Sequence, residues 1–136
     1  MHRSLFLATR GPGLYEFTRE LAPWVADCEE GVLTLFVRHS SASLVIQENA
    51  DPDVRLDLAE YFARLVPPSD RPEMAWMRHI CEGPDDMPAH VKAALLPTSL
   101  QIPVISGRLG LGTWQGVYLF EHRTAPHRRE VLALLR

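Results

Sequence analysis

The sequence predicts an α+β domain with antiparallel or mixed β-sheets. Short runs of β-branched and aromatic residues occur in both halves of the chain, two segments place apolar residues at helical spacing, and glycine or proline separates successive segments. The chain has 136 residues, a usual size for one domain with its own hydrophobic core, and neither a repeat nor a low-complexity linker interrupts it. We therefore expect a single domain over residues 1–136.

The N-terminal part predicts two strands and a helix. Residues 3–9 form the first expected strand, and residues 14–17 a short second one. Thr18 is a plausible N-cap for a helix that runs to about Glu29, in which Pro23 is tolerable only within the first turns.

The next part predicts two neighbouring strands. Gly31 breaks the chain before the apolar run of residues 32–37, which is apolar on both faces, as expected for a central buried strand. Residues 43–48 are expected to lie beside it after a turn at residues 40–42.

The clearest helix follows, with Asp51 as its cap and Pro52 at its first position. Its apolar residues recur at helical spacing: Val54, Leu58, Tyr61, Phe62 and Leu65. Another helix is expected to begin near Asp86, with Pro88 in its first turn. Its apolar face is predicted to consist of Met87, Val91, Ala94 and Leu95. Strands return at residues 100–104, 114–123 and 130–135, which brings the expected total to about seven strands.

Composition excludes several classes of function. The formal net charge of −3 does not favour binding to nucleic acid or to an anionic membrane. The longest apolar run, residues 32–37, is far too short to cross a bilayer. Two cysteines without a framework spacing, Cys28 and Cys81, favour a reducing compartment, so we expect a cytoplasmic protein.

A first group of polar residues flanks the predicted strand at residues 43–48. His39 and Ser40 precede this strand, and Glu48 and Asn49 end it, where the rim of an active site often lies. For Asp51 we favour a helix cap over a functional role.

A denser group lies within one loop and one helical turn: His79, Glu82, Asp85, Asp86 and His90. Imidazoles and carboxylates together bind a divalent ion or move protons. Asp86 and His90 are four residues apart and share one face of the expected helix. The alternative is a helix cap with solvated acids, and the spacing matches no standard zinc motif.

Two further groups lie near the C-terminus. The glycine-rich segment 107–115 permits an anion-binding nest, although tight turns between strands are the simpler explanation. Glu121 interrupts an apolar run and is either an edge residue or a buried, paired one. Of the nearby arginines, Arg128 and Arg129 are expected to be solvated, and Arg123 is the candidate for binding phosphate or carboxylate.

Taken together, three segments resemble the signatures of the YjbQ-like family, also described as the secondary thiamine-phosphate synthase family. They are HSSASLVIQENADPDV at residues 39–54, HICEGPDDMPAH at residues 79–90, and IPVISGRLGLGTWQ at residues 102–115, followed by Glu121 and Arg123. The likeness covers nearly the whole chain in the same order. Two departures are Ser40, where a threonine is usual, and Cys81, where a small or hydroxylated residue is usual.

The resemblance implies two packed antiparallel or mixed sheets with two to three helices, and a trimer around a threefold axis. It implies a catalytic pocket with these residues: His39, Glu48, Asn49, His79, Glu82, Asp86 and His90. The expected substrate or phosphate contacts are Arg108, Thr113, Trp114, Gln115, Glu121 and Arg123. The expected metal ligands are His39, His79 and His90, for a divalent ion such as Mg²⁺ or Zn²⁺, and no organic cofactor is expected.

The reaction that the resemblance implies joins a pyrimidine diphosphate to a thiazole phosphate and releases pyrophosphate. Two alternatives use the same residues: a metal-dependent hydrolase or phosphatase, and a non-catalytic trimer that binds an anionic metabolite. The expected partners are other copies of this chain and a small phosphorylated or anionic ligand, with neither nucleic acid nor membrane.

Overall fold

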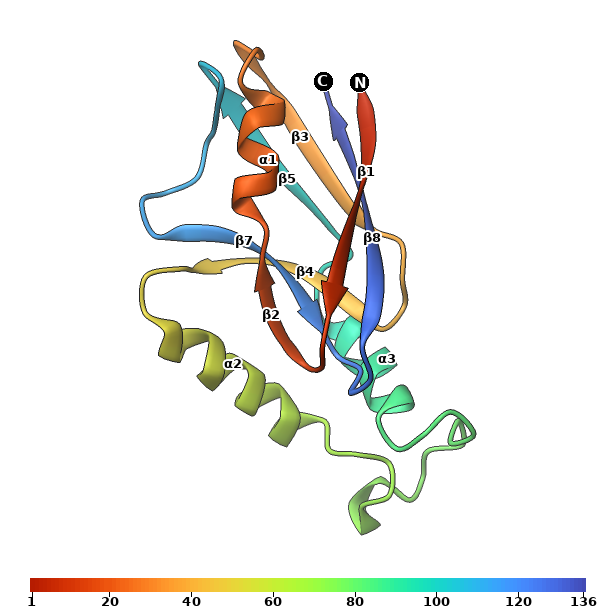
Figure 1. Ribbon diagram of the computed structural model, residues 1–136. Helices are drawn as coiled ribbons and strands as arrows, with labels where there is room; N and C mark the ends of the chain where they lie inside the picture. The colour runs from red at the N-terminus through yellow and green to blue at the C-terminus, as the bar shows by residue number, and fades with distance from the viewer.

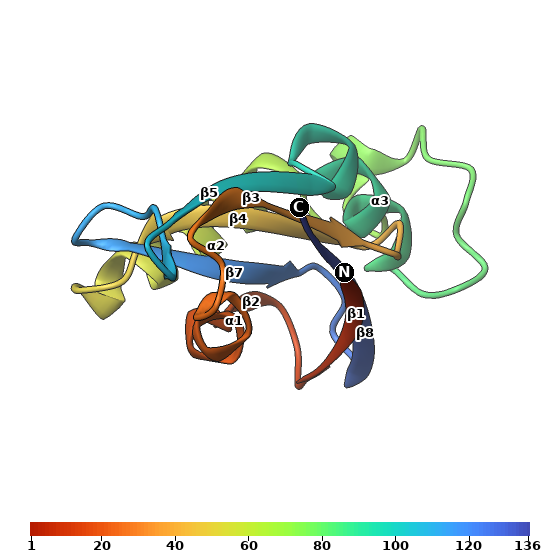
Figure 2. The ribbon, with the colours of Figure 1, turned by 90° about the horizontal axis from the view of Figure 1, so that it is seen from above.

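The computed structural model describes residues 1–136 as two antiparallel β-sheets with three α-helices (Figures 1 and 2). The larger sheet has the strand order β1 (His2–Thr9), β8 (His127–Leu135), β3 (Glu30–Val37), β5 (Ser99–Ile105) and β6 (Arg108–Leu109). The smaller sheet has the order β2 (Gly13–Glu16), β7 (Gln115–Glu121) and β4 (Ala42–Glu48). The prediction of an α+β fold with two packed sheets is therefore confirmed.

The helices are α1 (Thr18–Val25), α2 (Pro52–Leu65) and α3 (Asp86–Leu95), with a 3₁₀ turn at Pro72–Met74. Helix α2 lies below the smaller sheet in Figure 1, and α3 lies at the opposite end of β4 from the start of α2. None of the helices has the length and apolar character needed to cross a membrane.

The core lies between the sheets and α1. Alternate residues of β3 and β8 face it, because successive side chains of a strand point to opposite faces. The smaller sheet and α1 close it from the other side. Its fully buried members include Leu33, Leu35, Leu44, Leu119, Val131, Ala133, Leu21 and Val25.

The expected pairing of residues 32–37 with residues 43–48 is wrong. Strand β4 pairs with β7 in the smaller sheet, with Ala42 opposite Glu121, whereas β3 pairs with β5 and β8 in the larger one. The turn at residues 40–41 thus carries the chain from one sheet to the other. Strand β3 is central, but it is not buried on both faces, since Val32 and Phe36 are 43% and 46% exposed.

The boundaries around α1 also differ from the prediction. Phe17 is the N-cap, and the hydroxyl of Thr18 instead accepts a hydrogen bond from the backbone N–H of Val117 at 2.9 Å. The helix ends at Val25 rather than near Glu29, after Pro23 has removed one N–H from its hydrogen-bond ladder. Gly31 lies inside β3, where a Cβ atom would approach the carbonyl oxygen of Arg136 to 2.5 Å.

The two long helices begin where the sequence predicts. Asp51 caps α2, and its carboxylate accepts a hydrogen bond from the backbone N–H of Asp53 at 2.9 Å. The apolar face of α2 is only partly packed, and Tyr61 and Leu65 are exposed. On α3, the predicted apolar residues Ala94 and Leu95 are exposed and Pro88 and Ala89 are buried instead, because the helix turns its other side toward the sheet.

Candidate functional site

Three side chains at the beginning of α3 converge on one point. The Nε2 atom of His79 lies 2.6 Å from Oδ2 of Asp86, and Nε2 of His90 lies 3.3 Å from the same oxygen. One ligand atom from each of the three residues lies within 4.8 Å of the other two. Asp86 is buried, whereas the two imidazoles remain partly open to solvent. The arrangement offers two nitrogens and one oxygen to a single bound ion.

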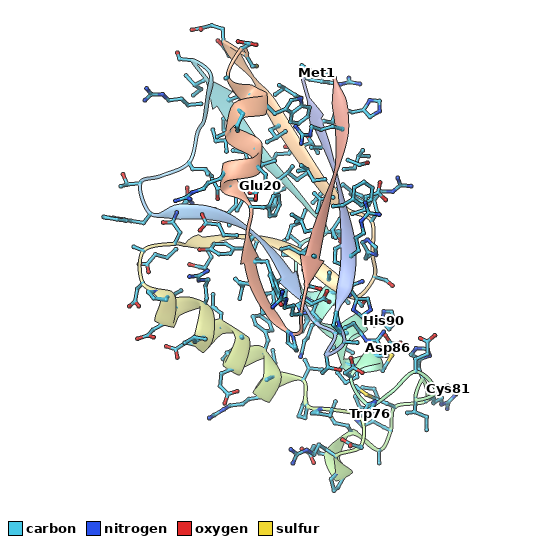
Figure 3. The ribbon with its side chains drawn as sticks, in the orientation of Figure 1. Met1, Glu20, Trp76, Cys81, Asp86 and His90 are labelled. Atoms are coloured by element: carbon cyan, nitrogen blue, oxygen red, sulfur yellow. The ribbon has the colours of Figure 1, made fainter.

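Local structure explains why these residues meet. Asp86 is the first residue of α3, and His90 follows one helical turn later on the same face (Figure 3). His79 comes from the long loop between α2 and α3, which folds back onto the start of the helix. Glu82 lies in the same loop, and its Oε2 is 3.4 Å from Nε2 of His79. The expected convergence of His79, Glu82, Asp86 and His90 is a feature of the structure.

The ring of His90 has a defined tautomer when it is neutral. Its Nδ1 lies 2.9 Å from the backbone carbonyl oxygen of Ser40. A carbonyl only accepts hydrogen bonds, so Nδ1 carries the proton and the free lone pair is on Nε2. That lone pair faces the carboxylate oxygen of Asp86, an unfavourable contact unless a proton or a metal ion lies between the two atoms.

Arg123 holds both acidic residues at the start of α3. Its Nε donates to Oδ2 of Asp85 at 2.8 Å, and its Nη1 lies 2.7 Å from Oδ1 of Asp86. Its Nη2 donates to the backbone carbonyl of Glu82 at 3.1 Å. Because all three guanidinium nitrogens have partners within the protein, Arg123 positions the site rather than extending toward a ligand.

These contacts shift the acid–base properties of the site. The hydrogen bond to Asp86 raises the pKa of His79. Burial by itself would raise the pKa of Asp86, but the hydrogen bond from His79 and the charges of Arg123 and His90 outweigh it and lower that pKa. Burial also opposes ionisation of Asp85, yet hydrogen bonds from Arg123 and Thr124 lower its pKa to about 2. Both aspartates are therefore carboxylates at neutral pH.

An open groove of about 730 Å³ adjoins His90. It is lined by residues after β3 and by the side of α3, among them Arg38, His39, Ala93 and Thr98. His39 faces this groove, but its Nε2 accepts a hydrogen bond from the backbone N–H of Glu130 at 2.8 Å. His39 is not a member of the group that offers ligand atoms to a common ion. Of the three expected metal-binding histidines, the structure thus brings two together, His79 and His90, and both lie beside Asp86.

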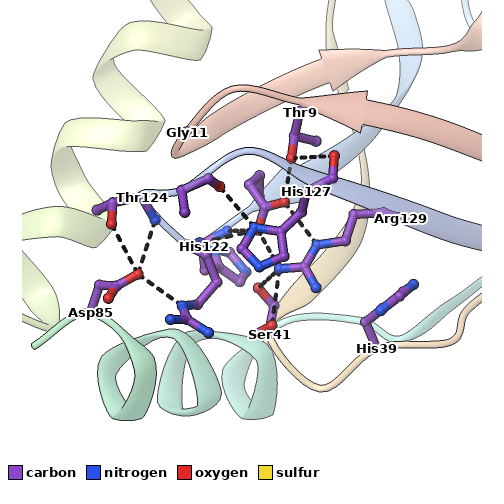
Figure 4. A network of polar contacts seen from close by, with 12 residues as sticks. Thr9, Gly11, His39, Ser41, Asp85, His122, Thr124, His127 and Arg129 are labelled. Atoms are coloured by element: carbon purple, nitrogen blue, oxygen red, sulfur yellow. Dashed lines mark hydrogen bonds and ion pairs between the residues drawn. The ribbon is translucent and has the colours of Figure 1, made fainter. Parts of the chain in front are cut away.

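A buried ion pair supports the neighbouring strands. Arg129 Nε donates to Glu121 Oε1 at 2.8 Å, and Thr9 donates to the same oxygen at 2.6 Å (Figure 4). The other oxygen of Glu121 accepts from the backbone N–H groups of His122 and Arg123. Glu121 is fully buried and paired with Arg129, which decides between the two alternatives that the sequence left open.

The prediction that Arg129 is solvated is wrong. Arg129 is buried and also donates to the hydroxyl of Ser41 at 3.0 Å. A signal for this position was present in the sequence, because Arg129 is in phase with the core residues Val131, Ala133 and Leu135 along β8.

The other predicted residues lie at the far end of the smaller sheet. Glu48 pairs with Gln115 across β4 and β7, and the backbone N–H of Asn49 donates to the carbonyl of Trp114 at 2.9 Å. Glu48 is six residues along β4 from Ala42, about 20 Å at strand geometry, so this group is separate from His90 within one chain (Figure 1). Trp114 is 62% exposed, not part of the core.

The glycine-rich segment has no part in the His79 group either. Arg108 belongs to β6, beside Ile105, which pairs with Glu30 at the start of β3. His39 follows the other end of β3. Thr113 precedes Trp114 in the exposed loop before β7. Within one chain, the predicted site residues therefore form two groups at opposite ends of the molecule.

The chain is similar to known proteins over almost its whole length. The family described as UPF0047 protein YjbQ-like matches residues 3–135 of the chain. The chain belongs to this family. The YjbQ-like relative from Synechocystis sp. is 55% identical over 130 residues, which cover 94% of this chain and 86% of the relative. The UPF0047 protein YjbQ of Escherichia coli O157:H7 is 41% identical over 136 residues, covering 98% and 95% of the two chains.

Solved structures of YjbQ-like proteins and their relatives share the fold. A conserved protein from Thermus thermophilus is 36% identical with a TM-score of 0.83, and the match covers 98% of both chains. A YjbQ/UPF0047 protein from Clostridium acetobutylicum is 30% identical with a TM-score of 0.82, covering 100% of this chain and 99% of the other. The chain thus shares its overall fold with these solved structures.

Proposed function

We propose that the chain is a metal-dependent enzyme that acts on a small phosphorylated or anionic substrate. The observation that carries the proposal is the shared oxygen of Asp86, which the Nε2 atoms of His79 and His90 both face. Catalytic zinc sites use three protein ligands and keep a further position open. Two imidazoles with one carboxylate fit this donor set, whereas Mg²⁺ prefers oxygen ligands. We therefore favour Zn²⁺ over Mg²⁺.

The surrounding residues would keep this centre in place. Ser40 orients the ring of His90 through its carbonyl oxygen, and Arg123 holds the outer oxygen of Asp86. Such outer contacts orient ligands and tune a metal site. The bound ion would stabilise negative charge on a substrate oxygen. The groove beside His90 gives a substrate access to this point, with Arg38 and His39 on its wall.

Metal content and turnover test the centre together. The purified protein is expected to bind one Zn²⁺ per chain by elemental analysis, and His90→Ala is expected to lose both the metal and the turnover of a phosphate-ester panel. His2→Ala, in the exposed start of β1, is the matched control and retains both. Equal metal content in the wild type and in His90→Ala would contradict the proposal.

The finer proposal is thiamine-phosphate synthesis, which the resemblance of the three signatures favours. In that reaction the thiazole nitrogen forms a bond to the pyrimidine methylene carbon as the bond from this carbon to the diphosphate oxygen breaks, and pyrophosphate leaves. Product analysis after incubation with both substrates distinguishes the alternatives. Thiamine phosphate with pyrophosphate supports the synthase, inorganic phosphate alone supports a hydrolase, and binding without any product supports a non-catalytic role.

A homotrimer is the proposed assembly, and an exposed apolar face of the larger sheet supports it. Phe6, Val32, Phe36 and Ile105 are between 43% and 60% exposed, and the strand register places them on one side of the sheet. Phe36 also lines the groove beside His90, so a neighbouring chain on this face would border the site. Phe36→Glu is expected to dissociate the trimer in sedimentation experiments, and Leu56→Glu on the exposed side of α2 is not. A monomeric wild-type protein would contradict this assembly.

A further inference from the structure

A second, smaller cavity lies between α2, α3 and β7, on the other side of Asp85 and Asp86 from the groove beside His90. Its volume is about 170 Å³, below the range of about 300–1,000 Å³ for drug-sized ligands. Its walls are mostly apolar, with Phe62 and Val66 on one side and Pro88 and Phe120 on the other. The cavity therefore has room for a small molecule with an apolar body.

His122 lines this cavity, and one of its ring nitrogens has no partner in the protein. His122 is 2% exposed, and its Nε2 lies 2.9 Å from the hydroxyl of Ser43, which is fully buried. Its Nδ1 is the single buried side-chain nitrogen or oxygen without a hydrogen bond in the protein. Because buried polar groups are almost always paired, this atom indicates a missing partner.

The wall also carries a cation without an ion pair. Lys92, on α3, is half-buried, and no carboxylate lies within 4.0 Å of its ammonium group among the ion pairs of the chain. Two carboxylates line the cavity, and both already have partners: Asp85 is bonded to Arg123 and Thr124, and Glu121 to Arg129 and Thr9. Lys92 is the only lysine among 14 basic residues, so a flexible ammonium occurs at this position alone.

We propose that this cavity binds a small monocarboxylate. The carboxylate accepts hydrogen bonds from Nδ1–H of His122 and from the ammonium of Lys92, while a short apolar chain packs against Phe62 and Phe120. This binding mode requires the tautomer with the proton on Nδ1, in which the hydroxyl of Ser43, 2.9 Å from Nε2 of His122, donates to that nitrogen. A carboxylate suits the site better than a phosphate dianion, because there are two donors and most of the wall is apolar.

The site is distinct from the His79 centre. Asp85 and Asp86 are consecutive, and their carboxylates face in different directions: Asp85 lines the small cavity and Asp86 faces His79 and His90. Arg123 bonds to both. A ligand in the small cavity would therefore lie beside the residues that hold the metal centre without contacting the metal ligands.

A titration with isobutyrate tests the proposal. Binding is monitored through the ¹⁵N resonances of the His122 ring, and a chelator is present to remove metal ions. We expect a saturable shift of these resonances, and about tenfold or weaker binding for Lys92→Met, because a hydrogen bond to a charged group is lost. Isobutyramide has nearly the same shape as isobutyrate but no charge. Its affinity for the wild type is expected to be no higher than the affinity of isobutyrate for Lys92→Met. Arg64→Met, on the exposed side of α2, is the matched control and leaves the affinity unchanged.

A variant that fills the cavity provides a second measurement. Ala59→Leu narrows the cavity while both donors remain, so isobutyrate binding is expected to fall by about tenfold or more. No saturable shift of His122 in the wild type would overturn the proposal, as would equal affinities in wild type and Lys92→Met. A crystal soaked in isobutyrate that holds only water at Nδ1 of His122 would also overturn it, since water alone then completes the site.

Discussion

Asp86 and His90 lie one helical turn apart on α3, and Nε2 of His90 is 3.3 Å from Oδ2 of Asp86. The same oxygen lies 2.6 Å from Nε2 of His79. A helix begins at this point, so the spacing of Asp86 and His90 is set by helical geometry, whereas His79 depends on the preceding loop.

Asp86→Asn is expected to weaken Zn²⁺ binding by about tenfold or more. The substitution keeps the shape of the side chain and removes the charge that a metal ligand supplies. Calorimetric titration with Zn²⁺ measures the affinity, and the rise of Tm with Zn²⁺ provides an independent readout. Asp70→Asn, an exposed acid in the loop after α2, is the control. The same affinity in Asp86→Asn and wild type would exclude Asp86 as a ligand.

Arg123→Lys is expected to loosen the loop that carries His79 and Glu82. A lysine keeps one charge but loses the planar group that bonds Asp85, Asp86 and the carbonyl of Glu82 at once. Hydrogen exchange at residues 79–85 should become faster, and exchange in the core strand β3 should not change. Arg64→Lys, in an exposed pair with Glu60, should leave exchange in the loop unchanged. A loop that exchanges at the wild-type rate in Arg123→Lys would show that Arg123 does not hold it.

Arg129→Met is expected to lower the free energy of unfolding by about 3–5 kcal/mol. The change leaves the buried carboxylate of Glu121 without its cationic partner, and breaking a buried pair in this way is costly. Urea unfolding measures the loss. Arg64→Met removes an exposed pair and should change stability by less than about 0.5 kcal/mol. A loss of similar size in both variants would contradict a buried ion pair at Glu121.

His122 is expected to make the protein less stable below pH 6.5. Burial and the charge of Lys92 lower the pKa of His122 to about 3 in the folded state, against 6.5 as the ordinary value. The unfolded chain therefore takes up a proton that the folded chain does not between these two pH values. Stability is complete above pH 6.5, and this residue lowers it by about 1.4 kcal/mol for each pH unit below.

Urea unfolding of wild type and His122→Gln between pH 7 and pH 5 isolates this contribution. Glutamine keeps a hydrogen-bonding group near Ser43 but does not titrate. The wild type should lose more stability than His122→Gln over this pH range. Parallel pH profiles for the two proteins would mean that His122 is protonated as easily in the folded state as in the unfolded one.

Local signals in the sequence predicted most of the elements. Asp51 and Pro52 mark the start of α2, and Asp86 marks the start of α3, because caps and first-turn prolines act within a few residues. The pairing of residues 43–48 could not be predicted in this way. Strand pairing depends on residues far apart in the chain, and β7, the partner of β4, lies about 70 residues further along.

For the candidate site as well, local relationships were predictable and long-range ones were not. Asp86 and His90 were predictable as one group because a single helix carries both. The separation of Glu48 and Gln115 from His90 was not, since it follows from the direction in which β4 leaves the turn after Ser41. The alternation of buried and exposed residues along β8 indicated that Arg129 is buried. Its pairing with Glu121 depends on how β7 and β8 pack, which the sequence did not predict.

The amino-acid sequence alone determined the fold class, the start of each long helix and the membership of the YjbQ-like family. Tertiary structure alone decided that His79 joins Asp86 and His90, that His39 bonds to the backbone of Glu130, and that His122 lies against a cavity with Lys92. The physical reason is the sequence separation over which each interaction acts. Hydrogen-bond caps and helical periodicity involve residues that are near neighbours in the chain. Burial and the convergence of polar side chains instead depend on how separate strands and helices pack.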